Sequence, residues 1–228
     1  MVVTLHRHPF PDRLVQPAEV VGDEGGAQGV AVVGEAVLRD EDRFSRVAAV
    51  DLVHKRGGKV FLDLKFHDIP NTVKHAVKNA AAMGVYSVSL HLSGGPEMLK
   101  ACAGLEKRPK LWGISVLTSF NEYNLFRSGY RCGIDKTVKN LATMGLENGA
   151  DGVVCSPLEA ARFKKLFEGK LKFITPGIRP EALGDDQQRA VTPAAARAAG
   201  ADFIVVGRPI IAAKDPAAAA AGILEALK

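Results

Sequence analysis

The stretch Phe61-Leu-Asp-Leu-Lys-Phe-His-Asp-Ile-Pro-Asn-Thr-Val73 decides the fold, because it places three charged side chains at the end of an apolar, strand-like run. Alternate residues of a strand share a face, so Asp63 and Lys65 are predicted to point one way and their apolar neighbours the other. Charged side chains on a face that packs into the core need an ion-pair or hydrogen-bond partner, or a functional role that explains their burial. Two interpretations stay open at this point: a buried ion pair that closes the end of a strand, and an active site.

From residue 59 onward, short apolar runs alternate with amphipathic, alanine-rich ones, which is the pattern of repeated β/α units. The apolar runs are KVFLDLKF, VSLHL near residue 88, LWGISVLT, GVVCS, KFITPGI and FIVVGRPI. Helices are predicted between and after them at Thr72 to Met83, Lys136 to Asn148, Leu158 to Phe167, Pro193 to Ala199 and Pro216 to Leu227. Continuously apolar strands indicate a parallel sheet covered by helices.

Two further strands would close this sheet into an eight-stranded barrel. The candidates are Val2 to Leu5 and Gly29 to Val37. We therefore predict an α/β fold, a (β/α)8 TIM barrel, whose first two β/α units have the weakest patterns. A chain of 228 residues, of which 47% are hydrophobic, suits one such domain over residues 1–228, with an atypical segment at 1–45 that is either irregular or strand-forming.

The composition excludes several classes of function. A net charge of +5 and a pI near 9.1 suit an anionic ligand, but the basic residues are dispersed, so we expect no nucleic-acid partner. No run approaches the ~20 apolar residues of a membrane span, and the N-terminus does not read as a signal peptide, so we expect a cytoplasmic protein. Cys102, Cys132 and Cys155 lack metal-ligand spacing, so we expect reduced thiols and no metal.

The last two predicted strands end in residues that suit an anion. Barrels of this type hold chemistry at the C-terminal ends of their strands and commonly bind phosphate on the loops after strands seven and eight. Arg179 and Gln187 follow the run KFITPGI, and Gly207 and Arg208 follow FIVV. Glycine lets backbone N–H groups approach an anion, and arginine offers a planar fork to phosphate oxygens. The alternative is a tight turn and a solvated polar loop.

Five strings in the second part of the chain together carry a family resemblance. They are Asp63-Leu-Lys65-Phe-His67-Asp68-Ile-Pro-Asn-Thr72, Ser115-Val-Leu-Thr118-Ser, Thr175-Pro-Gly-Ile-Arg179-Pro, Asp186-Gln187 and Val206-Gly-Arg208-Pro-Ile. In order and spacing they resemble the orotidine 5'-phosphate decarboxylase family, from about Val50 to the C-terminus. Related sugar-phosphate enzymes of the same superfamily share Asp-x-Lys-x-x-Asp but not the continuation Ile-Pro-Asn-Thr.

The resemblance implies a carboxy-lyase that converts orotidine 5'-monophosphate to uridine 5'-monophosphate and carbon dioxide in pyrimidine biosynthesis, without metal or organic cofactor. It implies three catalytic residues. Lys65 would donate a proton to C6 of the pyrimidine, and Asp63 would lie beside the departing carboxylate. Asp68 would reach the active site of the neighbouring subunit in a homodimer.

The resemblance also implies a set of substrate-binding residues: Thr72, Thr118, Pro176, Arg179, Gln187, Gly207 and Arg208. Thr118 would bond the pyrimidine edge, Thr72 would contact the ribose in the neighbouring subunit, and the last four would hold the 5'-phosphate. Both threonines have an alternative role, because threonine beside a strand end or a helix start is commonly a cap.

The N-terminal segment departs from the family pattern. The family's first strand ends in an aspartate and its second in a lysine, whereas Val21 to Arg46 contains no lysine and Asp12 stands in a Pro-Phe-Pro-Asp turn context. Either a divergent segment still builds two strands, or the start of the sequence is altered, for example by a reading-frame error. We favour the second, which leaves open a catalytically impaired nucleotide-binding barrel. A magnesium-dependent sugar-phosphate enzyme is the third alternative.

Overall fold

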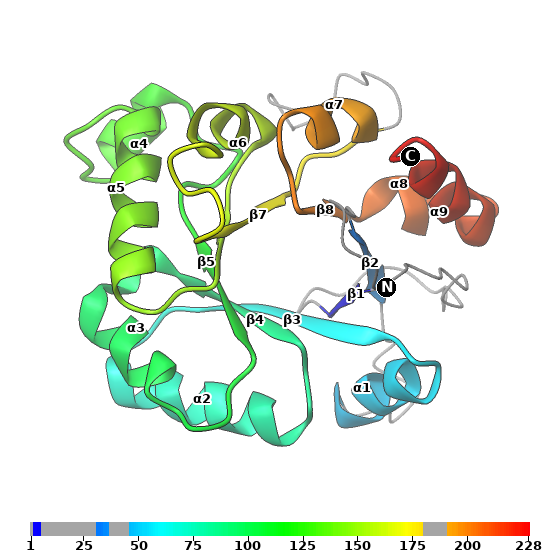
Figure 1. Ribbon diagram of the computed structural model, residues 1–228, viewed down its shortest axis with the longest axis horizontal. Coiled ribbons are helices and arrows are strands. Elements are labelled where there is room, and N and C mark those ends of the chain that lie inside the picture. The colour runs from blue at the N-terminus through cyan, green and yellow to red at the C-terminus, as the bar shows by residue number, and fades with distance from the viewer. Residues whose placement is uncertain (1, 6–30, 37–45, 180–190) are drawn as a thin grey trace.

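The computed structural model describes residues 2–5, 31–36, 46–179 and 191–228, and its strands form a closed barrel in which every pairing is parallel (Figure 1). The strands are β1 (Val2–Leu5), β2 (Ala31–Ala36), β3 (Lys59–Phe66), β4 (Ser87–His91), β5 (Lys110–Ile114), β6 (Gly152–Val154), β7 (Lys172–Thr175) and β8 (Phe203–Val206). The predicted TIM-barrel fold is confirmed. Both candidate N-terminal strands are present, the second shorter than expected.

The order of strands around the barrel is not sequential at its start. β1 pairs with β2 and β3, and β2 pairs with β8, so that the order runs β1-β2-β8-β7-β6-β5-β4-β3. In a strictly sequential barrel β1 would lie between β8 and β2. The first two strands have therefore exchanged places, while β3 to β8 follow the chain.

Helices surround this barrel (Figure 1). They are α1 (Arg46–Lys55), α2 (Pro70–Ala82), α3 (Pro96–Ala103), α4 (Glu122–Arg127), α5 (Ile134–Glu147), α6 (Pro157–Phe163), α7 (Pro193–Ala198), α8 (Arg208–Ile211) and α9 (Pro216–Glu225). Three of them begin with a polar cap followed by proline: the side chains of Ser156, Thr192 and Asp215 each accept a backbone N–H of the first turn. This combination satisfies a helix start and fixes its first φ angle.

The apolar residues form two layers, one on each side of the sheet. Outside the barrel, Val60, Leu62 and Leu90 belong to the cluster that packs under the helices. Inside it, Trp112 lies between two other rings, with centroids 4.5 Å from Phe61 and 4.8 Å from Phe203. The interior of the barrel is thus filled by aromatic side chains.

The N-terminal ends of β5 and β7 are held by a repeated aspartate. Asp151 accepts the backbone N–H of Leu111 at 2.8 Å, and Asp202 accepts that of Phe173 at 2.8 Å. Each aspartate also pairs with the lysine that opens the same strand, Lys110 or Lys172. The residue just before β6 is therefore tied to β5, and the residue just before β8 to β7, each by one carboxylate.

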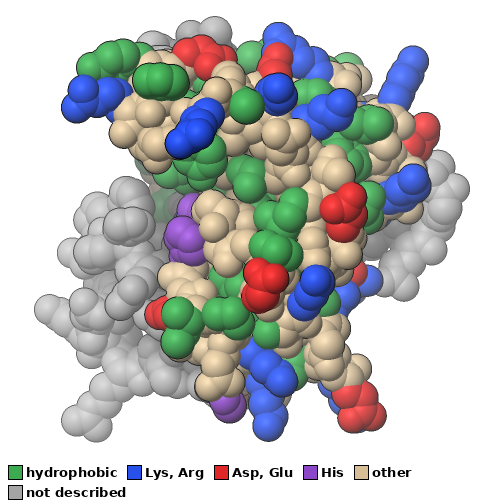
Figure 2. Space-filling view, turned by 90° about the vertical axis from the view of Figure 1, so that its left-hand side faces the viewer, with side chains coloured by type: hydrophobic (Ala, Val, Ile, Leu, Met, Phe, Trp, Pro, Cys, Tyr) green, Lys and Arg blue, Asp and Glu red, His purple; other side chains and the backbone are tan. Residues whose placement is uncertain are grey.

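The surface charges and the helix lengths bear on two expectations from the sequence, that the protein binds no nucleic acid and spans no membrane. Figure 2 shows the face at the left of Figure 1, where Lys and Arg are interspersed with Asp and Glu rather than gathered into a stripe. Within the described ranges, no helix is long and apolar enough to cross a membrane.

The three cysteines are free thiols, and no disulfide joins them. Burial raises the pKa of the Cys102 thiol to about 11.

Candidate active site

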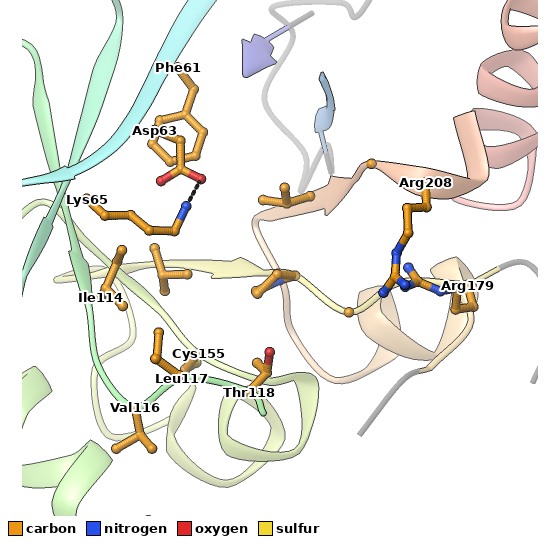
Figure 3. A pocket seen from close by; sticks show the side chains of 15 residues that line it. Phe61, Asp63, Lys65, Ile114, Val116, Leu117, Thr118, Cys155, Arg179 and Arg208 are labelled. Carbon is orange, nitrogen blue, oxygen red and sulfur yellow. Dashed lines mark hydrogen bonds and ion pairs between the residues drawn. The ribbon is translucent and has the colours of Figure 1, made fainter. Parts of the chain in front are cut away.

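Asp63 and Lys65 lie together at the C-terminal end of β3, as their spacing predicts. The Lys65 ammonium donates to Oδ2 of Asp63 over 2.7 Å (Figure 3). The carboxylate side chain is only 9% exposed, whereas the lysine side chain is 42% exposed and lines a pocket. An ion pair that only closed a strand end would be sealed on both sides. The open ammonium group therefore favours the second interpretation, a site that meets a ligand.

The strand changes geometry where it carries these charges. Leu62 pairs with Val88 and Phe66 with Leu90, so three residues of β3 lie opposite the single residue Ser89 of β4. Within this bulge Lys65 has φ of 52°, in the left-handed region that residues other than glycine rarely adopt. Bulges and strained backbone collect at functional sites, where they redirect a side chain.

A pocket of about 270 Å³ opens at this end of the barrel, with Asp63 and Lys65 at one side (Figure 3). Its wall is otherwise mainly apolar, formed by Phe61, Ile114, Val116, Leu117, Val154, Cys155, Pro176 and Val205. Such a wall excludes water, and charges in a water-poor site interact more strongly than in bulk solvent. The pocket thus suits a small ligand that packs against the apolar wall and presents a charged group to Asp63 and Lys65.

The opposite side of the pocket is cationic. The guanidinium groups of Arg179 and Arg208 lie next to each other, well away from Lys65 (Figure 3). Gly207, the residue before Arg208, also lines the pocket. Arg179 follows β7 and Arg208 begins α8 after β8. Arg179 is 6% exposed and one of its amino groups donates to the carbonyl of Ile178. Two guanidinium forks at one place fit the oxygens of a phosphate.

The structure brings together most residues predicted from the sequence. Beside Asp63 and Lys65, the pocket is lined by the predicted Thr118, Pro176, Arg179, Gly207 and Arg208. Asp68 and Thr72 are exposed and do not line it. The Asp68 carboxylate accepts the backbone N–H of Ile69, which is itself 67% exposed. Gln187 and Asp12 lie outside the described residues.

Sequence reasoning missed the pocket wall and one polar residue behind it. The apolar residues of the wall carry no chemical signal, because isolated Ile, Val and Leu are the ordinary content of a barrel strand. Ser89 has a weak signal: Ser87, Ser89 and His91 alternate with apolar residues along β4, which marks a polar inner face. Ser89 is fully buried and its hydroxyl donates to Oδ1 of Asp63.

Two histidines lie beside the charged pair. The rings of His67 and His91 stack with centroids 5.0 Å apart. Burial, together with the charges of His67 and Lys65, lowers the pKa of His91 below its ordinary value of 6.5, and Asp63 offsets part of this. His91 is thus neutral at pH 7, which limits the positive charge gathered around Lys65.

The chain is similar to proteins of known family over most of its length. It is 51% identical over 180 residues to the orotidine 5'-phosphate decarboxylase of Halorhodospira halophila, with 76% of each protein covered. With that of Chromobacterium violaceum it is 48% identical over 175 residues, covering 75% of this chain and 71% of the relative. The crystal structure of orotidine 5'-phosphate decarboxylase from Lactobacillus acidophilus superposes with a TM-score of 0.69 at 35% identity, covering 81% of both chains.

The family model agrees with these relatives and extends further toward the N-terminus than the motifs do. It is described as orotidine 5'-phosphate decarboxylase / HUMPS family and matches residues 21–223, whereas the resemblance seen in the sequence begins near Val50 and its first motif at Asp63. The match spans the strands that carry the charged pair and those that carry the arginines. On this evidence, the chain belongs to the orotidine 5'-phosphate decarboxylase / HUMPS family.

Proposed function

We propose that this protein decarboxylates orotidine 5'-monophosphate to uridine 5'-monophosphate in pyrimidine biosynthesis, in the cytoplasm and without a cofactor. The observation that carries the proposal is one pocket with the Asp63–Lys65 pair on one side and Arg179 and Arg208 on the other. The named relatives, at 48% and 51% identity, favour this reaction over a sugar-phosphate activity.

Lys65 is the residue on which the proposed chemistry depends. Breaking the bond between C6 and the carboxylate releases carbon dioxide and leaves the electron pair on C6, where the pyrimidine ring does not delocalise it. A fixed ammonium group beside C6 favours this developing anion and then gives it a proton. The overall change consumes one proton and yields uridine 5'-monophosphate, so the ammonium group is afterwards recharged from solvent.

Asp63 supplies the second electrostatic term. Its carboxylate is nearly buried and held on both oxygens, by Ser89 on Oδ1 and by Lys65 on Oδ2. Held beside the substrate carboxylate, it repels that group in the ground state and less so as carbon dioxide departs. The same carboxylate also keeps the Lys65 ammonium group directed into the pocket.

The two arginines contribute to the reaction from a distance. Phosphate binding by Arg179 and Arg208 would hold the pyrimidine against Lys65 and keep the pocket closed to water. Binding energy from such a non-reacting group can be used for catalysis, so a substrate without phosphate should lose turnover as well as affinity. Gln187, in the segment between the two arginines, and Gly207 belong to this proposed phosphate site, while Thr118 and Pro176 would position the ring.

The active unit that we propose is a homodimer. Asp68 and Thr72 do not line the pocket of their own chain and are exposed, as is the side chain of Ile69. If Asp68 takes part in the reaction, this position suits the site of a neighbouring subunit. Analytical ultracentrifugation tests the dimer, and mixing Asp68→Ala with Lys65→Ala chains tests the shared site, because hybrid dimers regain one intact site.

The decisive experiment follows the loss of orotidine 5'-monophosphate by its ultraviolet absorbance. We expect turnover by the parent and a fall in kcat of at least about 10²- to 10³-fold in Lys65→Ala, the cost of removing one preorganised charge from a transition state. Lys139→Ala, at an exposed lysine on α5, is the matched control and should retain full activity. A parent no faster than Lys65→Ala would contradict the proposal.

One observation favours an alternative, a nucleotide-binding barrel with impaired catalysis. Neither β1, with the sequence VVTL, nor β2, with AVVGEA, contains the aspartate or the lysine that the family pattern places there. Calorimetry with uridine 5'-monophosphate separates the two functions. Tight binding without turnover of orotidine 5'-monophosphate would establish the alternative, and binding with turnover would exclude it.

A further inference from the structure

Ser89 occupies a place that the strand register makes unusual. On β4 it is the single residue opposite the three-residue bulge of β3 that contains Asp63 and Lys65. A bulge removes backbone groups from the ladder, and those groups need other partners when they are buried. Ser89 is fully buried, so its hydroxyl is also obliged to find partners.

The Ser89 hydroxyl uses both of its hydrogen-bonding capacities within the charged pair. It accepts the backbone N–H of Lys65 over 2.9 Å and donates to Oδ1 of Asp63 over 2.5 Å. The Lys65 ammonium group donates to the other oxygen of Asp63 over 2.7 Å. The three residues therefore form a closed ring of hydrogen bonds, from the Lys65 backbone through Ser89 and Asp63 to the Lys65 side chain.

This ring constrains the backbone conformation of Lys65 and the rotation of the Asp63 carboxylate, and the proposed chemistry depends on both. The bond from the Lys65 N–H supports a backbone conformation, with φ of 52°, that would otherwise relax toward the ordinary β region. The bond to Asp63 fixes the rotation of a carboxylate whose other oxygen directs the ammonium group. Without the hydroxyl, the Lys65 N–H loses this acceptor and the Asp63 carboxylate loses this donor, so that the Lys65 backbone and the carboxylate can both turn.

We propose that Ser89 is a positioning residue of this site, acting through Asp63 and Lys65 without touching the substrate. The expected effect of Ser89 on turnover rests on the proposed decarboxylation. Its expected effect on the conformation of Lys65 and Asp63 rests on the bulge alone. Ser89 does not line the pocket, so its effect should appear in turnover and leave the phosphate and pyrimidine contacts unchanged.

The chain offers a closely matched control on the same strand. Ser87 lies two residues before Ser89, is equally buried, and its hydroxyl has no hydrogen-bond partner among the residues that the structure describes. Ser87→Ala and Ser89→Ala thus delete the same atom from the same face of β4. Ser89→Ala removes two hydrogen bonds, whereas Ser87→Ala removes none of those that the structure describes. Ser89→Thr keeps the hydroxyl and serves as the rescue variant.

The test compares kinetics and ligand binding in these three variants. We expect kcat to fall about 10- to 100-fold in Ser89→Ala, the range for a lost hydrogen bond to a charged group, with little change in KM. Binding of uridine 5'-monophosphate should stay at the parent level in all three. Ser87→Ala should match the parent, and Ser89→Thr should recover most of the lost turnover.

A double-mutant cycle with Asp63→Asn shows whether Ser89 acts through Asp63. In that case the two losses in kcat do not multiply, because the second substitution removes a bond whose partner has already changed. Full multiplication of the losses, unchanged kcat in Ser89→Ala, or equal loss of nucleotide binding and turnover would each overturn the inference.

The structural consequence can be tested separately from the reaction. A crystal structure of Ser89→Ala should show Lys65 leaving positive φ or the Asp63 carboxylate rotated; an unchanged bulge would refute the inference even if the kinetics agreed. If the parent itself fails to decarboxylate orotidine 5'-monophosphate, the proposed function fails, and this crystal structure still decides the role of Ser89.

Discussion

At the scale of single residues, Lys65 combines a chemical group with an unfavourable backbone. Its φ of 52° lies in a region that costs a residue with a Cβ about 1–2 kcal/mol, and glycine nothing comparable. The conformation is kept because it turns the ammonium group into the pocket beside Asp63. Stability and function are therefore opposed at this one position.

This opposition predicts an order of stability between two inactive variants. Lys65→Gly and Lys65→Ala both remove the ammonium group from Asp63, so that loss cancels in their comparison. Lys65→Gly should be the more stable by about 0.5–1 kcal/mol, because the relief of strain exceeds the greater entropy that glycine gives the unfolded chain. Urea unfolding at 25 °C measures the difference. Equal stability, or a more stable alanine variant, would show that the left-handed conformation carries no strain.

His91 predicts how stability depends on pH. Its pKa in the fold lies below 6.5 through burial and through the charges of His67 and Lys65, partly offset by Asp63. As the pH falls below 6.5, the unfolded chain takes up a proton at this position before the folded chain does, so stability is lost on acidification. His91→Gln should flatten the dependence of unfolding free energy on pH below 6.5. A steeper or unchanged dependence contradicts this assignment.

At the scale of elements, the sequence predicted what depends on neighbouring residues in the chain. β3 to β8 were found because each lies in a short, mainly apolar run, and α7 began as predicted because proline fixes its first turn. Leu158 to Phe167 overshot, since α6 ends at Phe163. The bulge opposite Ser89 could not be predicted, because it depends on the register between two strands.

In the site, too, the residues marked by the local sequence were predicted, and those brought together only by the fold were not. The charged motif and the arginines were found because charged residues at the ends of apolar strands are conspicuous in a sequence. The apolar side of the pocket, including Ile114, Val116 and Leu117, became visible only when strands distant in the chain were brought together. Short helices such as α4 and α8 also escaped prediction, because six or four residues are too few to show a helical period.

The repeated aspartates predict where ion pairs matter for stability. Asp202 accepts the backbone N–H of Phe173 and pairs with Lys164 and Lys172, and its side chain is only 18% exposed. Asp202→Ala leaves that N–H without this acceptor, so we expect a loss of about 2–3 kcal/mol. Asp135, half-exposed in its pair with Arg162, is the matched control, for which exposed pairs predict at most about 1 kcal/mol.

Thermal or urea unfolding of both alanine variants measures these losses. Similar values at the two positions would mean that the backbone bond to Asp202 contributes little. The same experiment with Asp151→Ala should reproduce the larger loss, because Asp151 makes the equivalent bond to Leu111 at the start of β5.

At the scale of the whole molecule, the barrel separates stability from chemistry. The aspartates that join one unit to the next lie at the N-terminal ends of the strands, whereas Asp63, Lys65 and the arginines lie at the C-terminal ends. Trp112 and the rings that it contacts fill the interior. Changes at one end of the barrel therefore leave the other largely intact, which is why this fold accepts different chemistry on the same frame.

The exchanged positions of β1 and β2 are the feature of the whole molecule that cross-linking can test. Val3 lies across from Val60, and Val33 from Val205. Neighbouring strands are about 4.8 Å apart, within the Cα separation of a disulfide, whereas strands two places apart are about 10 Å apart and out of reach. Cysteine pairs at 3/60 and at 33/205 should thus form disulfides under mild oxidation, with the bonded peptides identified by mass spectrometry.

A sequential barrel makes the opposite prediction, because β1 would then neighbour β8 and β2 would neighbour β3. The control variants carry cysteine pairs at 3/205 and 33/60, and the observed order predicts that neither cross-links. Disulfides in those control variants would instead show that the strands follow one another around the barrel in sequence order.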